Sequence, residues 1–294
     1  MLARKTLWCR RPRGMNCPVC GASSWCTISE DGQTVRCTRA PSDRPAFAKN
    51  GSHAWIHELG ASAKCITLKP EKEKKYKTVR QVTEIAERAF KHRLAQATRE
   101  QLSRDLGVSC GALHAMMVGY GTDDNGAFST WPSRNATGEI VGVNRRYQDG
   151  TKKLHYGTQG GLYYCMPRAG LAASPVLIVE GGSDTAAAYT IGLFAVGRHS
   201  NTGGADWIRA MNLSNILVLG EWDEHPEKRG KHHWCPETCR GCSHCFPGLF
   251  GAKMTAKELG CKYVFPPKGC KDLREVLAQG RVSELLRIIN RAGR

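Results

Sequence analysis

Apolar residues follow two different patterns along the chain, and the change comes near residue 175. Over residues 79–107 they recur every three or four positions, which predicts helices. Residues 126–156 are rich in β-branched and aromatic residues, which favour strands. Residues 176–179 and 216–219 are short, continuously apolar runs, as expected for strands buried on both faces of a parallel sheet. The pattern predicts an α+β segment followed by an α/β domain.

Polar residues suggest where the helices begin and end. Thr98 and Gln101 have the spacing of a capping box, which predicts a second helix that ends at Gly107. Ser109 is placed to cap a third helix. These two helices and the Gly turn between them also fit a helix-turn-helix, a sequence-specific DNA binder. Residues 109–117 contain no Arg or Lys, which favours a packing unit over a recognition helix.

Acidic residues come directly after the predicted parallel strands. Glu180 ends the first strand, and the two glycines after it permit a tight turn. Ser183 is the expected N-cap of the next helix, with Asp184 in its first turn. Open α/β sheets bind their ligands at the carboxyl ends of strands. Glu180 and Asp184 are therefore expected at a ligand site.

Three more acids follow the later strands. Glu221 and Asp223 come after the second apolar run, and alternate positions on a strand share a face, so we expect them to converge. Asp272 follows a predicted strand at residues 263–265 and opens a helix. In the plainer interpretation, these carboxylates are caps and loop residues of an ordinary doubly wound domain. Several acids gathered at strand ends instead favour a bound cation.

This order of acids resembles the Toprim domain of primases, topoisomerases and some nucleases. Glu180 and Asp184 match its Glu-Gly-x-x-Asp motif, and Asp223 matches the second acid of its Asp-x-Asp motif. Glu221 stands where the family usually has Asp, so the charge is kept on a longer side chain. The resemblance covers about residues 174–280. It implies Mg²⁺ or Mn²⁺ held by Glu180, Asp184, Glu221 and Asp223, with Asp272 as a further ligand.

The charge of the chain points to phosphate-rich partners. The 294 residues include 43 Lys and Arg against 26 Asp and Glu, for a net charge of +17. No run of 18 apolar residues is present, so no membrane span is predicted. Residues 1–14 are basic and lack the apolar core of a secretory signal. We expect a cytoplasmic protein associated with a nucleoid or with phage or plasmid replication.

Clustered cysteines predict a zinc ribbon over residues 15–60. A Cys-x-x-Cys knuckle is followed by an Asp31-Gly32 turn, which is typical of a hairpin. Folding about that turn brings two further cysteines towards the knuckle. His57 is a rival fourth ligand. The candidate zinc ligands are Cys17, Cys20, Cys26, Cys37 and His57.

A second Cys-rich segment interrupts the α/β region at residues 225–248. Four cysteines lie within eleven residues of one another, and three histidines flank them as spare ligands. Structural zinc is the favoured interpretation, with an iron–sulfur cluster as the rival. The candidate ligands are Cys235, Cys239, Cys242 and Cys245, with His232, His233 and His244 as the spares.

Two basic strands precede the acidic region. An Asp149-Gly150 turn predicts a hairpin, and its strands interleave basic residues with tyrosines, as surfaces that track a nucleic-acid backbone do. The plainer alternative is a solvated face of an antiparallel sheet. The basic residues are Arg145, Arg146, Lys152 and Lys153.

The order of the modules also carries information. The ribbon resembles the zinc-binding domain that precedes the catalytic core of bacterial and phage primases, and a ribbon followed by a Toprim domain is the primase arrangement. The modules expected are a basic arm (1–14), the ribbon (15–60), a charged linker (61–80), an α+β part of the core (81–173), the Toprim domain (174–280) and a closing helix (281–294).

The resemblance implies a DNA primase that joins ribonucleoside triphosphates into short RNA on single-stranded DNA. It implies that the four acids act in catalysis and that the basic strands hold nucleotide and template. The chain has no Gly-Lys-Ser/Thr phosphate loop, so a replicative helicase would be a separate partner. Two alternatives stay open, a Toprim nuclease and a non-catalytic DNA-binding protein with zinc modules and a helix-turn-helix.

Overall fold

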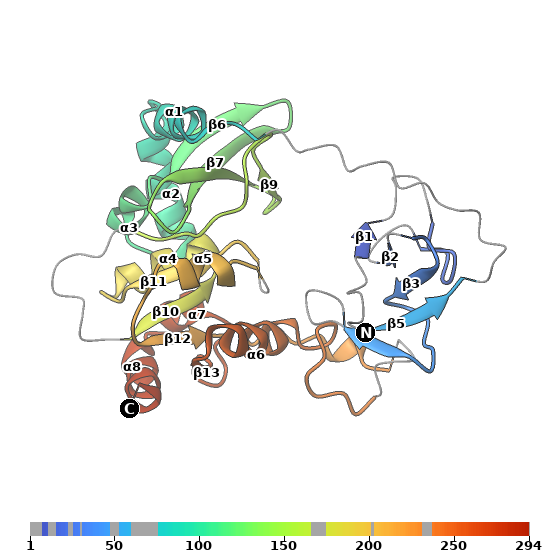
Figure 1. The fold of residues 1–294 in the computed structure, drawn as a ribbon. Helices are drawn as coiled ribbons and strands as arrows, with labels where there is room; N and C mark the ends of the chain where they lie inside the picture. Colours follow the sequence, from blue (N-terminus) through green and yellow to red (C-terminus); the bar gives the residue numbers. More distant parts are fainter. Residues whose placement is uncertain are drawn as a thin grey trace. The chain divides into compact units, whose positions relative to one another are not determined.

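The computed structural model describes residues 8–10, 16–22, 26–29, 31–47, 53–59, 76–165, 175–200, 203–230 and 237–293. The chain divides into two compact units (Figure 1). One comprises Met1–Glu73 with His225–Cys245, and the other comprises Lys74–Glu224 with Phe246–Arg294.

The larger unit contains a four-stranded parallel sheet. Its strands are β10 (Val176–Glu180), β11 (Ala195–Arg198), β12 (Ile216–Leu219) and β13 (Lys262–Val264), in the order β11-β10-β12-β13. Every neighbouring pair is parallel. The predicted α/β class, with a parallel sheet flanked by helices, is confirmed. The carboxyl ends of β10 and β12 consequently lie at one edge of the sheet.

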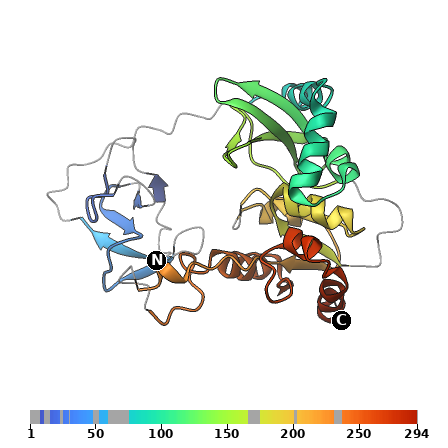
Figure 2. The same ribbon diagram turned by 180° about the vertical axis from the view of Figure 1, so that it is seen from behind.

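Helices cover both faces of this sheet (Figure 1, Figure 2). Alternate strand positions supply the two cores, because Leu177 and Val179 belong to one hydrophobic cluster and Ile178 to the other. One face packs against α4 (Gly181–Thr190), α7 (Leu273–Ala278) and α8 (Val282–Ala292), and the other against α5 (Ala205–Ala210) and α6 (Pro247–Leu259).

An antiparallel sheet with three helices completes the larger unit. The strands β6 (Gly119–Asp123), β7 (Gly126–Arg134), β8 (Ile140–Tyr147) and β9 (Lys152–Leu154) pair in sequence order. The helices are α1 (Val79–Phe90), α2 (Ala95–Leu106) and α3 (Cys110–Ala115). The hairpin about Gly150 is confirmed, with φ of 83° at that glycine.

Two of the helix starts differ from the prediction. Helix α2 begins at Ala95, so Thr98 lies inside it and its hydroxyl donates to Leu94 O at 2.8 Å. The capping box predicted at Thr98 is therefore wrong, and the structure has one at Thr78 and Gln81 instead. Ser183 is not an N-cap either, because α4 begins at Gly181. The second of these differences arises because Gly181, with φ of 81°, turns directly from strand into helix.

Helix α3 packs inside the larger unit. Ser109 caps it as predicted, since its hydroxyl accepts the Ala112 N–H at 3.1 Å. Ala112 and Leu113 are fully buried, and the Ser109 N–H donates to Thr190 Oγ1 of α4 at 2.9 Å. Helix α3 therefore packs one face into the larger unit, whereas Gly111 and His114 are exposed. Its lack of Arg and Lys favours a packing unit over a recognition helix.

The smaller unit contains a five-stranded antiparallel sheet. Its strands are β1 (Trp8–Arg10), β2 (Thr27–Ser29), β3 (Thr34–Cys37), β4 (Pro45–Phe47) and β5 (His53–Glu58), in the order β1-β2-β3-β5-β4. The turn at Gly32 joins β2 to β3 as predicted. A short 3₁₀ helix, Pro226–Lys228, belongs to the same unit. Across the described part of the chain, none of the helices is long and apolar enough to cross a bilayer.

Candidate active site

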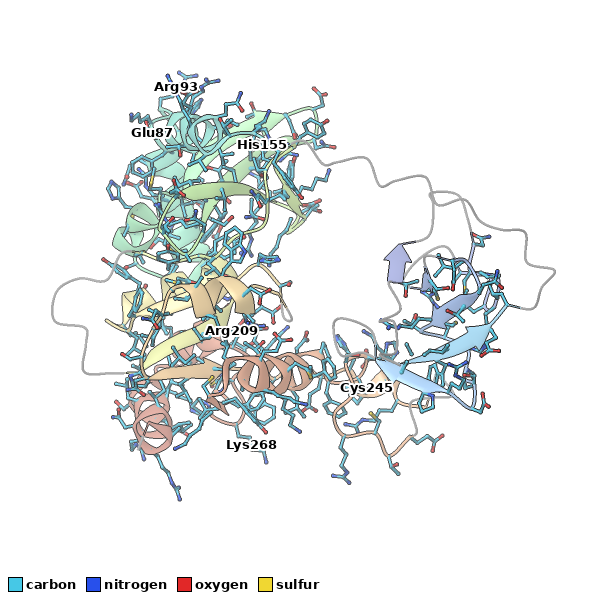
Figure 3. The ribbon with its side chains drawn as sticks, in the orientation of Figure 1. Glu87, Arg93, His155, Arg209, Cys245 and Lys268 are labelled. Carbon is cyan, nitrogen blue, oxygen red and sulfur yellow. The ribbon has the colours of Figure 1, made fainter. Side chains whose placement is uncertain are left out.

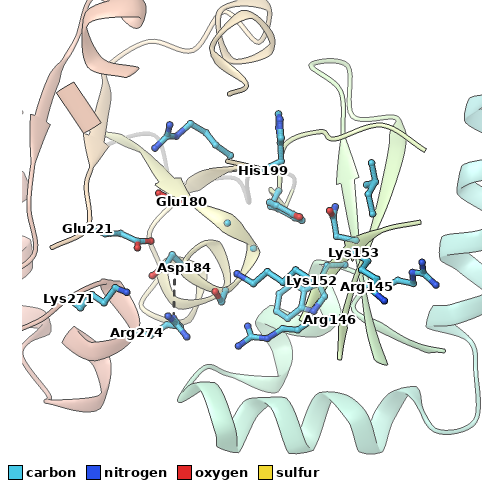
Figure 4. A pocket seen from close by; sticks show the side chains of 18 residues that line it. Arg145, Arg146, Lys152, Lys153, Glu180, Asp184, His199, Glu221, Lys271 and Arg274 are labelled. Carbon is cyan, nitrogen blue, oxygen red and sulfur yellow. Dashed lines mark ion pairs between the residues drawn. The ribbon is translucent and has the colours of Figure 1, made fainter. Parts of the chain in front are cut away.

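A cavity of about 410 Å³ lies in the larger unit, between the antiparallel sheet and the carboxyl edge of the parallel sheet (Figure 4). Acids from β10, α4 and the loop after β12 line one side. Basic residues of β8 and β9 line the other. This arrangement places acidic and basic side chains on facing sides of one cavity.

Three of the predicted acids line the cavity directly. Glu180 ends β10 and Asp184 lies in the first turn of α4, where only 4% of it is exposed. Glu221 follows β12 and also lines the cavity. Gly248 permits this placement, because a Cβ on it would come within 2.1 Å of the Glu221 carbonyl oxygen.

The other two acids do not line the cavity. Asp223 pairs with Lys271, whose Nζ is 3.3 Å from Asp223 Oδ1. Asp272 is buried and caps α7, since its Oδ1 accepts the Glu275 N–H at 3.0 Å. Its other oxygen pairs with Arg274. The structure thus brings all five acids to one end of the sheet but gives Asp272 a structural partner already.

Burial and mutual repulsion raise the pKa of each of the three acids that line the cavity. Burial, together with the charges of Asp184 and Glu180, raises the pKa of Glu221 to about 8. Burial and the nearby Asp272 raise the pKa of Asp184, and burial likewise raises that of Glu180. Such groups ionise readily once a cation is present, because the cation removes the repulsion between them.

A divalent cation fits this acid set. Asp184 Oδ1 is buried and has no hydrogen-bond partner among the described residues, and an orphaned carboxylate oxygen is a typical metal ligand. No three carboxylates in the described ranges have ligand atoms within 4.8 Å of one another. The acids therefore form an open wall, and Mg²⁺ held by few carboxylates usually completes its shell with water and phosphate oxygens.

The four predicted basic residues line the opposite wall, but they split into two pairs. Arg146 lies opposite Lys152 in the β8–β9 ladder, and Arg145 lies opposite Lys153. The charge of Asp184 acts on Arg146, and that of Lys152 acts on Glu180. Arg146 and Lys152 therefore face the acids (Figure 4).

The second pair has other partners. Arg145 donates to Asp123 Oδ2 at 2.6 Å, and its guanidinium lies 5.3 Å from the ring centroid of Phe128. Lys153 Nζ lies 5.2 Å from the ring of Tyr147. The interleaved tyrosine thus packs against basic side chains, which is a stabilising cation–π arrangement. Arg146 and Lys152 remain the better candidates for a ligand that reaches the acids.

The structure adds four basic cavity residues that the sequence analysis did not select. Arg198 ends β11 and His199 follows it, and the backbone of Arg198 pairs with Glu180 in the ladder. Lys271 precedes α7 and Arg274 lies in its first turn, with Arg274 Nε 3.9 Å from Asp184 Oδ2. Arg198 and His199 could have been selected from the sequence, because they lie at the carboxyl end of a buried strand. Lys271 and Arg274 flank Asp272, but their local sequence gives no sign that they face the acids.

The four ribbon cysteines come together in the smaller unit. The sulfur atoms of Cys17, Cys20, Cys26 and Cys37 all lie within 4.8 Å of one another. The backbone N–H groups of Arg39 and Ala40 donate to Cys37 Sγ at 3.4 and 3.2 Å, as is usual around a metal-bound thiolate. His57 is not in this group, and its Nε2 lies 3.0 Å from the carbonyl oxygen of Ala40. The donor set fits tetrahedral zinc.

Three cysteines of the second Cys-rich segment also form a group. The sulfur atoms of Cys239, Cys242 and Cys245 lie within 4.8 Å of one another. Cys235, His232 and His233 lie outside the described residues. His244 is described but is not in the group.

Comparison with solved structures finds similar folds in primases. The chain is 17% identical to a DnaG catalytic core, covering 72% of this chain and 79% of that chain with a TM-score of 0.49. It is 15% identical to the primase fragment of the bacteriophage T7 primase-helicase, covering 96% and 100% with a TM-score of 0.46. It is 12% identical to the zinc-binding and RNA polymerase domains of Aquifex aeolicus primase, covering 73% of this chain and 60% of that chain with a TM-score of 0.47.

No protein-family model and no curated protein matches the sequence. At these identities the likeness concerns the fold alone. The residues that line the cavity therefore provide the evidence for the function of this chain.

Proposed function

We propose that the chain is a primase-type nucleotidyltransferase that makes short RNA on a single-stranded DNA template. The observation that carries this proposal is the cavity with an acidic wall and a basic wall. A triphosphate needs both, because its phosphate oxygens bind a divalent cation and positive side chains together. The orphaned oxygen of Asp184 supports a cation on the acidic side.

The proposed reaction is a transfer of a nucleotidyl group. The 3′-hydroxyl of one nucleotide attacks the α-phosphorus of a ribonucleoside triphosphate, a P–O bond forms, and the α–β P–O bond breaks. Pyrophosphate leaves with the electron pair, and the hydroxyl proton passes to Glu180 or to water. If Glu180 instead holds the cation, water takes the proton.

The acids would hold Mg²⁺ or Mn²⁺. Asp184, Glu221 and Asp223 are the proposed ligands, and Asp272 is a weaker candidate because it already caps α7. The bound ion would polarise the α-phosphate and stabilise the leaving pyrophosphate. Arg146 and Lys152, which face the acids, would position the triphosphate in the same cavity.

The remaining partners follow from this reaction. The net charge of +17 suits a single-stranded DNA template. The four-cysteine ribbon would hold zinc and contribute to template selection. A separate replicative helicase would supply unwound template, and a cytoplasmic replication setting fits the proposal.

The test measures incorporation and cleavage in one reaction. Labelled ribonucleotides, single-stranded DNA of mixed sequence and Mg²⁺ or Mn²⁺ are incubated with wild type, Glu180→Gln and Glu224→Gln. Glu224 is exposed and does not line the cavity, so it is the matched control. Short RNA from wild type and control, and none from Glu180→Gln, supports the proposal.

Two other outcomes would overturn it. Glu180-dependent cutting of the DNA without RNA would make the chain a nuclease. Tight DNA binding with neither product would make it a non-catalytic DNA-binding protein.

A further inference from the structure

The second Cys-rich segment contains a compact thiol group outside the proposed active site. Cys239, Cys242 and Cys245 follow a Cys-x-x-Cys-x-x-Cys spacing, and their sulfur atoms lie within 4.8 Å of one another. Cys245, labelled in Figure 3, is fully buried. The spacing alone suits either zinc or an iron–sulfur cluster.

We propose that Cys239, Cys242 and Cys245 bind one zinc ion, separate from the ion of the four-cysteine ribbon. Thiolates on a single tetrahedral ion, each at about 2.3 Å from it, lie about 3.8 Å apart. In a four-iron cluster each cysteine binds a different iron, so the sulfur atoms lie farther apart. Mutual separations within 4.8 Å therefore favour a single ion, with a fourth donor completing its shell.

The backbone around these thiols supports the same conclusion. The Cys245 N–H donates to Cys242 Sγ at 3.3 Å. In the ribbon, the Ala40 N–H donates to Cys37 Sγ at 3.2 Å, with the same separation of three residues. The chain thus repeats at Cys242 the turn that it uses at a ribbon cysteine. Such N–H donors stabilise a metal-bound thiolate.

The ion would close the base of the segment. The His225 N–H donates to the Cys245 carbonyl oxygen at 2.6 Å, which joins the two ends of residues 225–245. A metal bound to Cys245 would hold the C-terminal end of residues 225–245 in place. Metal that binds only the folded state stabilises it, so the closed segment depends on the ion.

The experiment counts zinc in the full-length chain by mass spectrometry of the metal. Wild type should contain two zinc ions per chain, Cys242→Ser one, Cys26→Ser one and the double variant none. Cys110→Ser is the matched control, because Cys110 lies in neither thiol group, and it should keep two. Circular dichroism of each variant checks that the larger unit is folded.

A count of one zinc in wild type, or two in Cys242→Ser, would overturn the proposal. Iron with acid-labile sulfide in freshly purified wild type would also overturn it and assign a cluster. A second measurement needs no variant. Titrating wild type with a thiol-modifying mercurial should release two zinc ions per chain, and release of only one contradicts the second site. None of these outcomes depends on whether the chain makes RNA.

Discussion

Lys271 Nζ lies 3.3 Å from Asp223 Oδ1, so a fixed positive charge sits beside the acids proposed to bind a metal. Burial lowers the pKa of Lys271, but the charge of the Asp223 carboxylate and its hydrogen bond outweigh that effect. The pKa of Lys271 is therefore raised overall, and the ammonium form is stabilised. Arg274 makes a similar pair with Asp272 and lies near Asp184. Lys271 and Arg274 therefore neutralise part of the negative charge of these acids in the metal-free protein.

Removing Lys271 should make Mg²⁺ bind more tightly, because a competing cation is lost. We expect Lys271→Met to lower the half-saturating Mg²⁺ or Mn²⁺ concentration by about 2- to 10-fold, the effect of one nearby charge at the protein surface. Electron paramagnetic resonance of free Mn²⁺ measures the binding. Lys268→Met, at an exposed position nearby, should leave it unchanged. Weaker Mn²⁺ binding in Lys271→Met would show that Lys271 supports the site and does not compete with it.

The metal-free protein should lose stability as pH rises. The pKa of Glu221 is raised from 4.5 to about 8, so the folded state binds more protons than the unfolded state between those values. Stability from this group is therefore present below the unfolded pKa and is lost as pH approaches 8. Glu221→Gln should stabilise the protein at pH 8 by about 1–3 kcal/mol and have little effect at pH 4.5.

Thermal melts in Mg²⁺-free buffer test this, without a chelator so that the cysteine sites keep their zinc. Glu224→Gln is the control, since Glu224 is exposed. A melting temperature of Glu221→Gln equal to that of wild type at pH 8 would show that Glu221 is ionised at no cost. Added Mg²⁺ should stabilise wild type more than Glu221→Gln at pH 8.

The two faces of the basic hairpin should differ in function. Arg146→Ala and Lys152→Ala should each raise the KM for nucleotide by about 10-fold and reduce the salt slope of DNA binding by about one. Arg145→Ala should mainly reduce stability, because it leaves Asp123 without its 2.6 Å ion pair. Lys91→Ala, at the exposed residue that caps the end of α1, is the control. Equal kinetic losses at Arg145 and Arg146 would contradict the division into two faces.

His57 should not be a zinc ligand. Its Nε2 lies 3.0 Å from the Ala40 carbonyl oxygen, and the four ribbon cysteines supply the four donors that a zinc site needs without it. His57→Gln should therefore retain the zinc content of wild type, whereas Cys26→Ser should lose one ion and unfold the ribbon. Loss of zinc from His57→Gln would place the histidine in the site.

The acids and the parallel sheet were predictable because both depend on local patterns. A continuous apolar run defines a buried strand, and the residue after it lies at the sheet edge whatever the partner strand is. Glu180 and Glu221 are of this kind. Asp184 could be predicted at the same sheet edge because it lies one helical turn after Glu180.

The features that sequence analysis missed depend on distant residues. Lys271 and Arg274 face the acids only because β13 pairs with β12 and α7 packs against α4. Strand β6 contains glycines that have low strand propensity, and one of them, Gly119, is required where α1 crosses it, since a Cβ there would lie 2.5 Å from the Ala89 backbone. The start of α2 moved for a similar reason, because Ala95 is buried in packing that overrides the local capping preference at Thr98.

The most direct test asks whether both walls of the cavity are needed for one reaction. RNA synthesis on single-stranded DNA is measured for wild type, Asp184→Asn, Arg146→Ala and the exposed control Lys91→Ala, each at saturating Mg²⁺ or Mn²⁺. We predict RNA from wild type and control, a loss of about 100-fold or more in Asp184→Asn, and a loss in Arg146→Ala that higher nucleotide concentration partly restores. Full RNA synthesis by Asp184→Asn would contradict the assignment of this cavity as the site of nucleotidyl transfer.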